Sequence, residues 1–413
     1  MRRIIPGIMM LLFIGTTGAQ PLGNLTSPNK KLQLQVLLDK EGSVFYTLSF
    51  AGKAAVLPSR LGVQFKEGSG FYAGLKAGKV TTTQTDEVWK PVWGEESSIR
   101  NNYNELKVEF IQPALQNAIM YVVFRLYNEG LGLRYEWPAQ PKLNHFVVKD
   151  ELTEFALNAN HTAWWIPGDY DTNEYTYTQS RLSEVNTGIT SRFNEINTRV
   201  PWSPTGVQTP LMLKTDEGVY LNIHEAALLN YPVMQLEVKP PTNTLKSHLV
   251  PNVYGDKAYL QTPCKTPWRV INISDKATDL LASRLILNLN EPSKIAETSW
   301  IKPTKYVGLW WEMHVGVSSW DFAGTQDGTY DKAGLTPSGK HGATTVRTKQ
   351  YIDFAAKHGF DAVLVEGWNE GWEDWFGKWK EDVFDFVTPY PDFDLAEVQR
   401  YAQSKGVKMI MHH

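Results

Sequence analysis

Ionisable and aromatic side chains gather where three apolar segments in the last quarter of the sequence end. These side chains are Trp311, Glu366, Trp368, Asn369 and His412. A carboxylate beside aromatic rings can accept hydrogen bonds from sugar hydroxyls, so the combination suits a carbohydrate pocket. Each residue alone could equally be a satisfied polar group at the rim of a sheet. Because three segments end alike, the sequence favours a pocket.

A second cluster lies in residues 164–175, which read Trp-Trp-Ile-Pro-Gly-Asp-Tyr-Asp-Thr-Asn-Glu-Tyr. The carboxylates from Asp169 to Glu174 and the side-chain carbonyl between them are hard oxygen ligands of the kind that Ca²⁺ prefers, although their spacing is not that of an EF-hand loop. A solvated acidic turn would explain the same residues. The cluster is therefore a candidate metal site with a simpler alternative.

The segments that carry the first cluster alternate between strands and helices. Apolar runs at 306–315, 361–368 and 407–411 predict strands, and the segments 342–358 and 394–406 between them predict helices. Continuous apolar strands separated by helices are typical of parallel strand–helix–strand units. The carboxyl ends of such strands are where parallel α/β folds carry their chemistry. We expect a βα barrel or a doubly wound sheet here.

The region before Pro303 has a different period. From about residue 32 to residue 289 apolar and polar residues alternate in short runs broken by Gly, Pro, Asn and Asp, and the run 285–289 is one of those predicted as strands. This pattern predicts a large antiparallel β-sandwich or two packed β units. The fold class expected is therefore multi-domain, β followed by α/β, with a boundary near residue 303.

Charge and composition exclude several classes of partner. The chain has 413 residues, 41 Lys+Arg against 44 Asp+Glu, a net charge of -3 and 42% hydrophobic residues. No long basic run marks it as a binder of nucleic acid or of a membrane surface. Residues 1–19 have a charged start, an apolar stretch and a small-residue cleavage site, which predicts a signal peptide and an exported protein. The apolar stretch is too short for a membrane anchor.

The length bears on the α/β region. A (β/α)₈ barrel needs about 250 residues, and about 110 follow Pro303. We therefore expect the sequence to be a fragment that is cut inside its catalytic domain. A small three-stranded sheet that is complete as written is the alternative, but its last apolar strand would have an unpaired edge.

Several strings of residues together resemble glycoside hydrolase family 97. They are Gly308-Leu-Trp-Trp-Glu-Met-His-Val, Val365-Glu-Gly-Trp-Asn with Trp372-Glu373, Ile410-Met-His-His, and Leu57-Pro-Ser-Arg-Leu-Gly. The resemblance implies an exported, periplasmic α-glycosidase of a Bacteroidetes starch-utilisation system. It also implies a β-super-sandwich over 20–302 and the first three βα units of a (β/α)₈ barrel over 303–413.

The same resemblance implies roles for particular residues. Glu174 matches a glutamate that binds Ca²⁺ in the active site, Glu366 and His412 match positions that contact the sugar, and Trp311 looks like an aromatic residue of the pocket. The family's catalytic glutamates would lie after His413. We therefore expect no catalytic carboxylate in this chain, which alone should be inactive.

The implied reaction is α-glycoside hydrolysis by two carboxylates, about 6.5 to 9.5 Å apart in an inverting enzyme and about 5 to 5.5 Å apart in a retaining one. The two adjacent histidines favour an inverting α-glucosidase that acts on starch-derived oligosaccharides. A retaining α-galactosidase of the same family is one alternative, and a carbohydrate-binding protein without catalysis is another. The sequence predicts an oligosaccharide partner and no oligomeric state.

Overall fold

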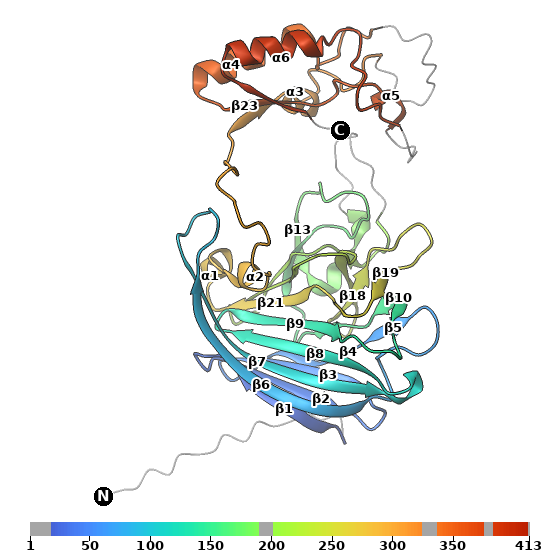
Figure 1. Ribbon diagram of the computed structural model, residues 1–413. Coiled ribbons are helices and arrows are strands. Elements are labelled where there is room, and N and C mark those ends of the chain that lie inside the picture. The colour runs from blue at the N-terminus through green and yellow to red at the C-terminus, as the bar shows by residue number, and fades with distance from the viewer. Residues whose placement is uncertain (1–17, 190–200, 324–336, 376–382, 412–413) are drawn as a thin grey trace, which may run out of the picture. The chain divides into compact units, whose positions relative to one another are not determined.

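The computed structural model describes residues 18–189, 201–323, 337–375 and 383–411 (Figure 1). The described residues form two compact units, the first ending at Lys294 and the second beginning at Ile295. We call them the sandwich unit and the α/β unit. Within the described ranges, no helix has both the length and the apolar character that crossing a membrane requires.

The sandwich unit begins with a four-stranded antiparallel sheet. Its strands follow chain order and are β1 (Gln20–Thr26), β2 (Leu32–Leu38), β3 (Val44–Phe50) and β4 (Lys53–Leu61). In β2 the alternation predicted from the sequence is real, since Leu32, Leu34 and Val36 are buried while Gln33 is exposed. This buried face packs against the next sheet (Figure 1).

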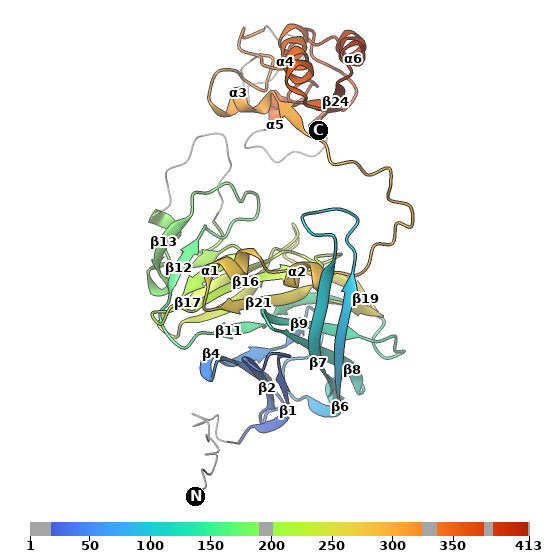
Figure 2. The ribbon, with the colours of Figure 1, turned by 90° about the vertical axis from the view of Figure 1, so that its left-hand side faces the viewer.

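The largest sheet among the described residues has ten strands, and Figure 2 shows β6 and β7 as a long hairpin at one edge. Neighbouring strands along this sheet are antiparallel. In spatial order they are β13 (Thr178–Arg181), β12 (Thr162–Trp165), β15 (Leu211–Lys214), β16 (Tyr220–Ala226), β21 (Trp268–Ser274), β9 (Gly130–Trp137), β8 (Ala118–Tyr127), β7 (Ile99–Gln112) and β6 (Lys76–Trp89), with β20 (Cys264–Lys265) paired to β9.

Two smaller antiparallel sheets complete the described part of this unit. One contains β19 (Ala258–Gln261), β10 (His145–Glu151) and β5 (Val63–Phe65). The other contains β11 (Glu154–Ala156), β18 (Thr244–Leu249), β17 (Met234–Lys239) and β14 (Gly206–Val207). Short 3₁₀ turns lie at Pro113–Leu115, Leu182–Glu184 and Thr187–Ile189.

A buried ion pair joins three strands of the sandwich unit. Arg269 on β21 donates to Glu151 on β10 at 2.8 and 2.7 Å, and to Glu225 on β16 at 2.5 Å. The side chains of Arg269 and Glu151 are fully buried. Removing one partner would leave an uncompensated buried charge, so this contact ties strands of different sheets together.

Two short helices, α1 (Ala277–Leu281) and α2 (Leu285–Asn288), lie near the end of the sandwich unit. The sequence predicted a strand at 285–289, and this prediction is wrong. Leu285 and Leu289 are both buried whereas Leu287 is 43% exposed, so the apolar residues follow a spacing of four and face one side of a helical turn. Leucines at 285, 287 and 289 fit the spacing of two that a strand has, and those at 285 and 289 also fit the spacing of four that a helix has. Alternation alone therefore predicted the wrong element.

The α/β unit is built on a three-stranded parallel sheet. Its strands are β22 (Tyr306–Gly308), β23 (Ala362–Val365) and β24 (Lys408–Met411) in that order. Helix α4 (Thr345–His358) connects the first two strands and α6 (Leu395–Ser404) connects the last two, and the helices lie side by side (Figure 1). The predicted parallel strand–helix–strand arrangement is therefore confirmed.

Capping interactions explain where these two helices begin and end. Thr344 accepts a hydrogen bond from the Arg347 amide, and α4 ends at Gly359, which has a φ of 71°. Asp394 caps α6 by accepting from the Glu397 amide at 2.9 Å. The Glu397 carboxylate itself accepts a hydrogen bond from Lys349 on α4 at 2.8 Å.

The predicted strand at 306–315 is a strand only in its first part. After Gly308 the chain turns into the short helix α3 (Trp310–His314), in which Met313 is buried beside the fully buried Leu309. The predicted strand at 361–368 also stops early, at Val365. Trp311 therefore lies on a helix that follows β22, instead of on the strand itself.

Candidate functional site

The turn after β23 carries three of the predicted sugar-contacting residues. Glu366 is half-buried, and Gly367 directly after it has a φ of 77°. A Cβ atom at position 367 would lie 2.6 Å from the carbonyl oxygen of Trp320. Only glycine fits both the left-handed backbone and this close approach. The chain therefore turns sharply at a fixed point next to the Glu366 carboxylate.

A buried histidine holds this turn in place. Nε2 of His341 lies 2.8 Å from the carbonyl oxygen of Gly367, and Nδ1 lies 2.8 and 3.0 Å from the two carboxylate oxygens of Asp392. The His341 side chain is 2% exposed. A carbonyl oxygen can only accept, so Nε2 is the donor to Gly367, while Nδ1 lies against the Asp392 carboxylate. His341, held by Asp392, thus donates to the turn beside Glu366.

Trp368 and Asn369 are more buried than a sugar-contacting role requires. Trp368 is 3% exposed and its ring lies 6.1 Å from that of Phe393 in the core of the unit. Asn369 is fully buried, and its Nδ2 donates to the carbonyl of Asp385 at 3.1 Å. Its Oδ1 has no hydrogen-bond partner among the described residues, so a water or ligand hydroxyl could satisfy it. A sugar-contacting role stays a prediction for both residues.

A buried carboxylate fixes the neighbouring loop, and the sequence did not single this residue out as part of a site. Glu373, at the start of α5 (Trp372–Trp375), is fully buried. Its Oε1 accepts from the Phe322 amide at 2.9 Å and from the Ala323 amide at 3.3 Å, and its Oε2 accepts from the Tyr390 hydroxyl. Burial and the hydrogen bond to Glu373 raise the pKa of Tyr390. This network holds the loop that contains Trp320 against the turn after β23.

Trp311, the other predicted pocket residue of the α/β unit that the structure describes, follows a neighbouring strand. Trp311 on α3 is 66% exposed, and its ring lies 5.8 Å from that of His314. Because β22 and β23 are parallel neighbours, α3 and the Glu366 turn both follow the carboxyl ends of adjacent strands. His412, which follows β24, lies outside the described residues. Trp311 and Glu366 thus remain candidates for one pocket.

In the sandwich unit the acidic segment forms a loop organised by Asp169. This residue is 3% exposed, and its Oδ1 accepts from the amides of Asp171 and Thr172 at 2.8 and 3.3 Å. Its Oδ2 accepts from the hydroxyl of Tyr175 at 2.7 Å. Glu174, by contrast, is exposed to solvent. The two carboxylates have different roles, because Asp169 shapes the loop whereas Glu174 is presented by it.

The metal prediction concerns the Glu174 carboxylate that this loop exposes. An exposed carboxylate on a rigid loop can serve as a hard oxygen ligand. Across the described ranges there is no group of three or more His, Cys, Asp or Glu side chains that could hold a metal ion. Glu174 would therefore supply one ligand of a larger set, and Ca²⁺ binding stays a prediction.

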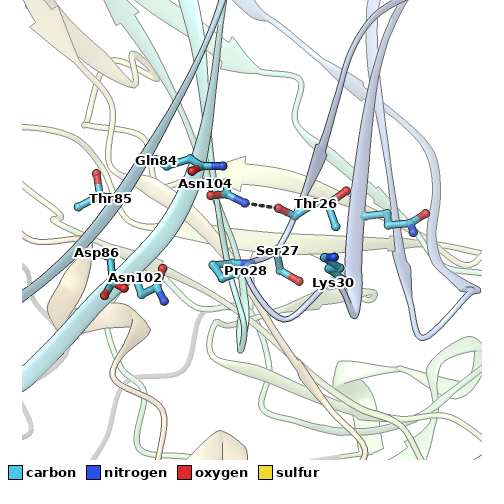
Figure 3. A pocket seen from close by; sticks show the side chains of 10 residues that line it. Thr26, Ser27, Pro28, Lys30, Gln84, Thr85, Asp86, Asn102 and Asn104 are labelled. Carbon is cyan, nitrogen blue, oxygen red and sulfur yellow. Dashed lines mark hydrogen bonds between the residues drawn. The ribbon is translucent and has the colours of Figure 1, made fainter.

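The sandwich unit also has a polar hollow with a volume of about 800 Å³ (Figure 3). It lies between the β1–β2 turn and the strands β6 and β7, and Asn104 closes one side by donating to the Thr26 carbonyl at 2.6 Å. Its lining residues are Thr26, Ser27, Pro28, Lys30, Gln33, Gln84, Thr85, Asp86, Asn102 and Asn104. It includes none of the predicted site residues and offers no aromatic side chain for a sugar ring.

Solved structures with a similar fold include two enzymes. A glycoside hydrolase family 97 enzyme from Pseudoalteromonas sp. strain K8, in complex with acarbose, is 38% identical with a TM-score of 0.79, covering 95% of this chain and 54% of that one. A structure of such an enzyme from the same strain contains panose. A β-arabinopyranosidase, at 18% identity and a TM-score of 0.70, shows likeness of fold alone.

Known sequences give the same family. A retaining alpha-galactosidase of Bacteroides thetaiotaomicron is 26% identical over 95% of this chain and 56% of its own length. The chain thus spans about half the length of the curated relatives it matches. Family models described as Glycosyl-hydrolase 97 N-terminal and Glycoside hydrolase 97 match residues 25–292 and 310–413. The chain therefore belongs to glycoside hydrolase family 97.

Proposed function

We propose that this chain supplies the sandwich and the first part of the catalytic region of an α-glucosidase that acts on starch-derived oligosaccharides. The observation that carries this proposal is the relative at 38% identity, whose strain also supplied a family 97 enzyme in complex with panose. Panose is a trisaccharide of α-linked glucose. By the full-length enzyme we mean a protein that has this chain and the remaining length of these relatives.

A retaining α-galactosidase is the second candidate. Two curated relatives are named as a retaining and a probable retaining alpha-galactosidase, at 26% and 24% identity. The structural relative is more similar to this chain, at 38% identity. For this reason we favour an inverting α-glucosidase over a retaining α-galactosidase.

In the proposed enzyme, the three parallel strands of the α/β unit begin a (β/α)₈ barrel. Glu366 accepts hydrogen bonds from hydroxyl groups of the sugar, and the aromatic ring of Trp311 packs against the sugar ring. His341 and Gly367 keep Glu366 at one position, so the carboxylate is already in place before the sugar binds. His412 is proposed as a second sugar contact. The carboxylates that act as acid and base are proposed to come from the remaining length of the enzyme.

Calcium is proposed as a cofactor, with Glu174 as a ligand from the sandwich unit. Ca²⁺ bound near the acid would hold carboxylates in register and stabilise anionic groups. Export to the periplasm is also proposed, on the signal-peptide layout of residues 1–19. Strand β1 begins at Gln20, next to the predicted cleavage site.

Hydrolysis of two substrates by the full-length enzyme tests this proposal. Panose represents the α-glucosides, and melibiose represents the α-galactosides. We expect panose to be cleaved with the higher kcat/KM, and proton NMR to show β-glucose as the first anomer released. Faster cleavage of melibiose with release of α-galactose would favour the second candidate. Cleavage of neither sugar would contradict both and favour a carbohydrate-binding protein.

A further inference from the structure

Two aromatic side chains of the sandwich unit have nearly parallel rings that are joined by a hydrogen bond. The hydroxyl of Tyr170 shares a hydrogen bond of 2.6 Å with Nε2 of His248 on β18. Their ring planes differ by 3° and their centroids are 5.8 Å apart. The hydrogen bond and the parallel orientation make the two rings one aromatic surface, which is wider than either ring alone.

A third ring supports this surface from one side. The indole of Trp202 stacks on the His248 ring with centroids 3.7 Å apart and an angle of 11° between the planes. Trp202 itself is seated against glycine, because a Cβ atom at position 206 would lie 2.7 Å from its Cζ2 atom. Its Nε1 donates to Gln235 on β17. The stack therefore runs from Gly206 through Trp202 to the surface of Tyr170 and His248.

The outermost layer of the stack is accessible and uncharged. Tyr170 is 37% exposed, although it is a large aromatic residue. Burial, together with the nearby charges of Lys257 and Lys246, lowers the pKa of His248 to about 4. The ring is therefore neutral at pH 7. A flat, neutral and rigidly supported aromatic surface matches the C–H face of a pyranose ring.

We propose that Tyr170 and His248, supported by Trp202, form a stacking platform for one pyranose ring of an oligosaccharide. This inference rests on the proposed function, because it takes its ligand class from it. The platform lies on the sandwich unit. Its Tyr170 belongs to the loop that also carries Glu174. It gives this unit a direct contact with sugar of its own.

Binding of panose and melibiose to the unmutated 413-residue chain and to three variants tests the platform. Tyr170→Ala removes half of the surface, Tyr170→Phe retains the ring without its hydroxyl, and Tyr254→Ala removes a tyrosine that is 82% exposed outside the stack. By calorimetry at pH 7, we expect Tyr170→Ala to weaken binding of at least one sugar about fivefold or more. Tyr170→Phe should weaken it less, and Tyr254→Ala should leave it unchanged.

A measurement on the unmutated chain does not depend on whether a variant folds. The ring signals of His248, assigned by NMR with the His248→Gln variant, should shift as the sugar is added. Unchanged affinity in Tyr170→Ala, no binding of either sugar, or no shift at saturating sugar would each overturn the platform. Hydrolysis of panose or melibiose by the full-length enzyme would in those cases still stand, so the two proposals fail separately.

Discussion

Nε2 of His341 donates a hydrogen bond to the carbonyl oxygen of Gly367, which is 26 residues away in the chain and adjacent to Glu366. The other ring nitrogen is bound by Asp392. A buried ring thereby connects the loop before α4, the turn after β23 and the loop before α6. The position of Glu366 thus depends on a residue that need not contact the sugar.

This relationship gives the first prediction. In His341→Ala, the carbonyl of Gly367 and the carboxylate of Asp392 lose their donor, and a cavity is left. We expect the α/β unit to lose about 2 to 4 kcal/mol of unfolding free energy. Hydrogen exchange of peptides around residue 367 measures this unit separately from the sandwich unit.

The matched control for His341 is His358→Ala on the exposed end of α4, where we expect a change below about 0.5 kcal/mol. If both variants exchanged at the rate of the unmutated chain, the buried histidine would not be holding the turn.

The acidic loop gives the second prediction, because its two carboxylates should separate by function. Asp169→Ala leaves several donors without their acceptor, so the stability of the sandwich unit should fall by about 1 to 3 kcal/mol in urea unfolding. Glu174→Ala should leave stability within about 0.5 kcal/mol but weaken Ca²⁺ binding by the full-length enzyme in titration calorimetry. Unchanged Ca²⁺ affinity in Glu174→Ala would show that this glutamate is not a ligand.

The low pKa of His248 gives the third prediction, which concerns pH. The folded value of about 4 lies below the ordinary value of 6.5, so the unfolded chain takes up this proton first as the pH falls. Stability of the sandwich unit should therefore decrease between pH 6.5 and pH 4, and this group should add no further loss below pH 4.

Comparison with His248→Phe isolates this contribution. The lysines near the ring, Lys246 and Lys257, stay charged throughout this range in both proteins, and other titrating groups are common to both. The decrease in melting temperature from pH 6.5 to pH 4 should be smaller in the variant. An equal decrease would show that His248 is protonated in the folded state at these pH values.

Several elements could be predicted from the sequence because local chemistry determines them. The alternation in β2 and the helix predicted within 394–406 depend on neighbouring residues alone, and both are present as expected in the structure. The runs 285–289 and 306–315 could not be assigned in this way. In short apolar segments, spacings of two and of four fit the same residues, so tertiary packing decides between strand and helix.

The contacts that position the candidate site are of a different kind. His341 and Gly367, or Glu373 and Tyr390, meet only after the chain has folded, and no local pattern marks either pair. The sequence could propose Glu366 as a site residue because of its place near the carboxyl end of a predicted strand. It could not show that a buried histidine and a second carboxylate fix the loops around it.

The most direct test of the account is the kcat/KM of the full-length enzyme on panose, measured for the unmutated protein, for Glu366→Gln and for Glu397→Gln. Loss of a charge-assisted hydrogen bond to the sugar should lower kcat/KM about tenfold or more in Glu366→Gln. Glu397, whose partner is Lys349 on α4, should be replaceable with a change of less than about twofold. Equal values for all three proteins, or no hydrolysis of panose or melibiose by the unmutated enzyme, would contradict the assignment of this turn to an α-glycoside hydrolase.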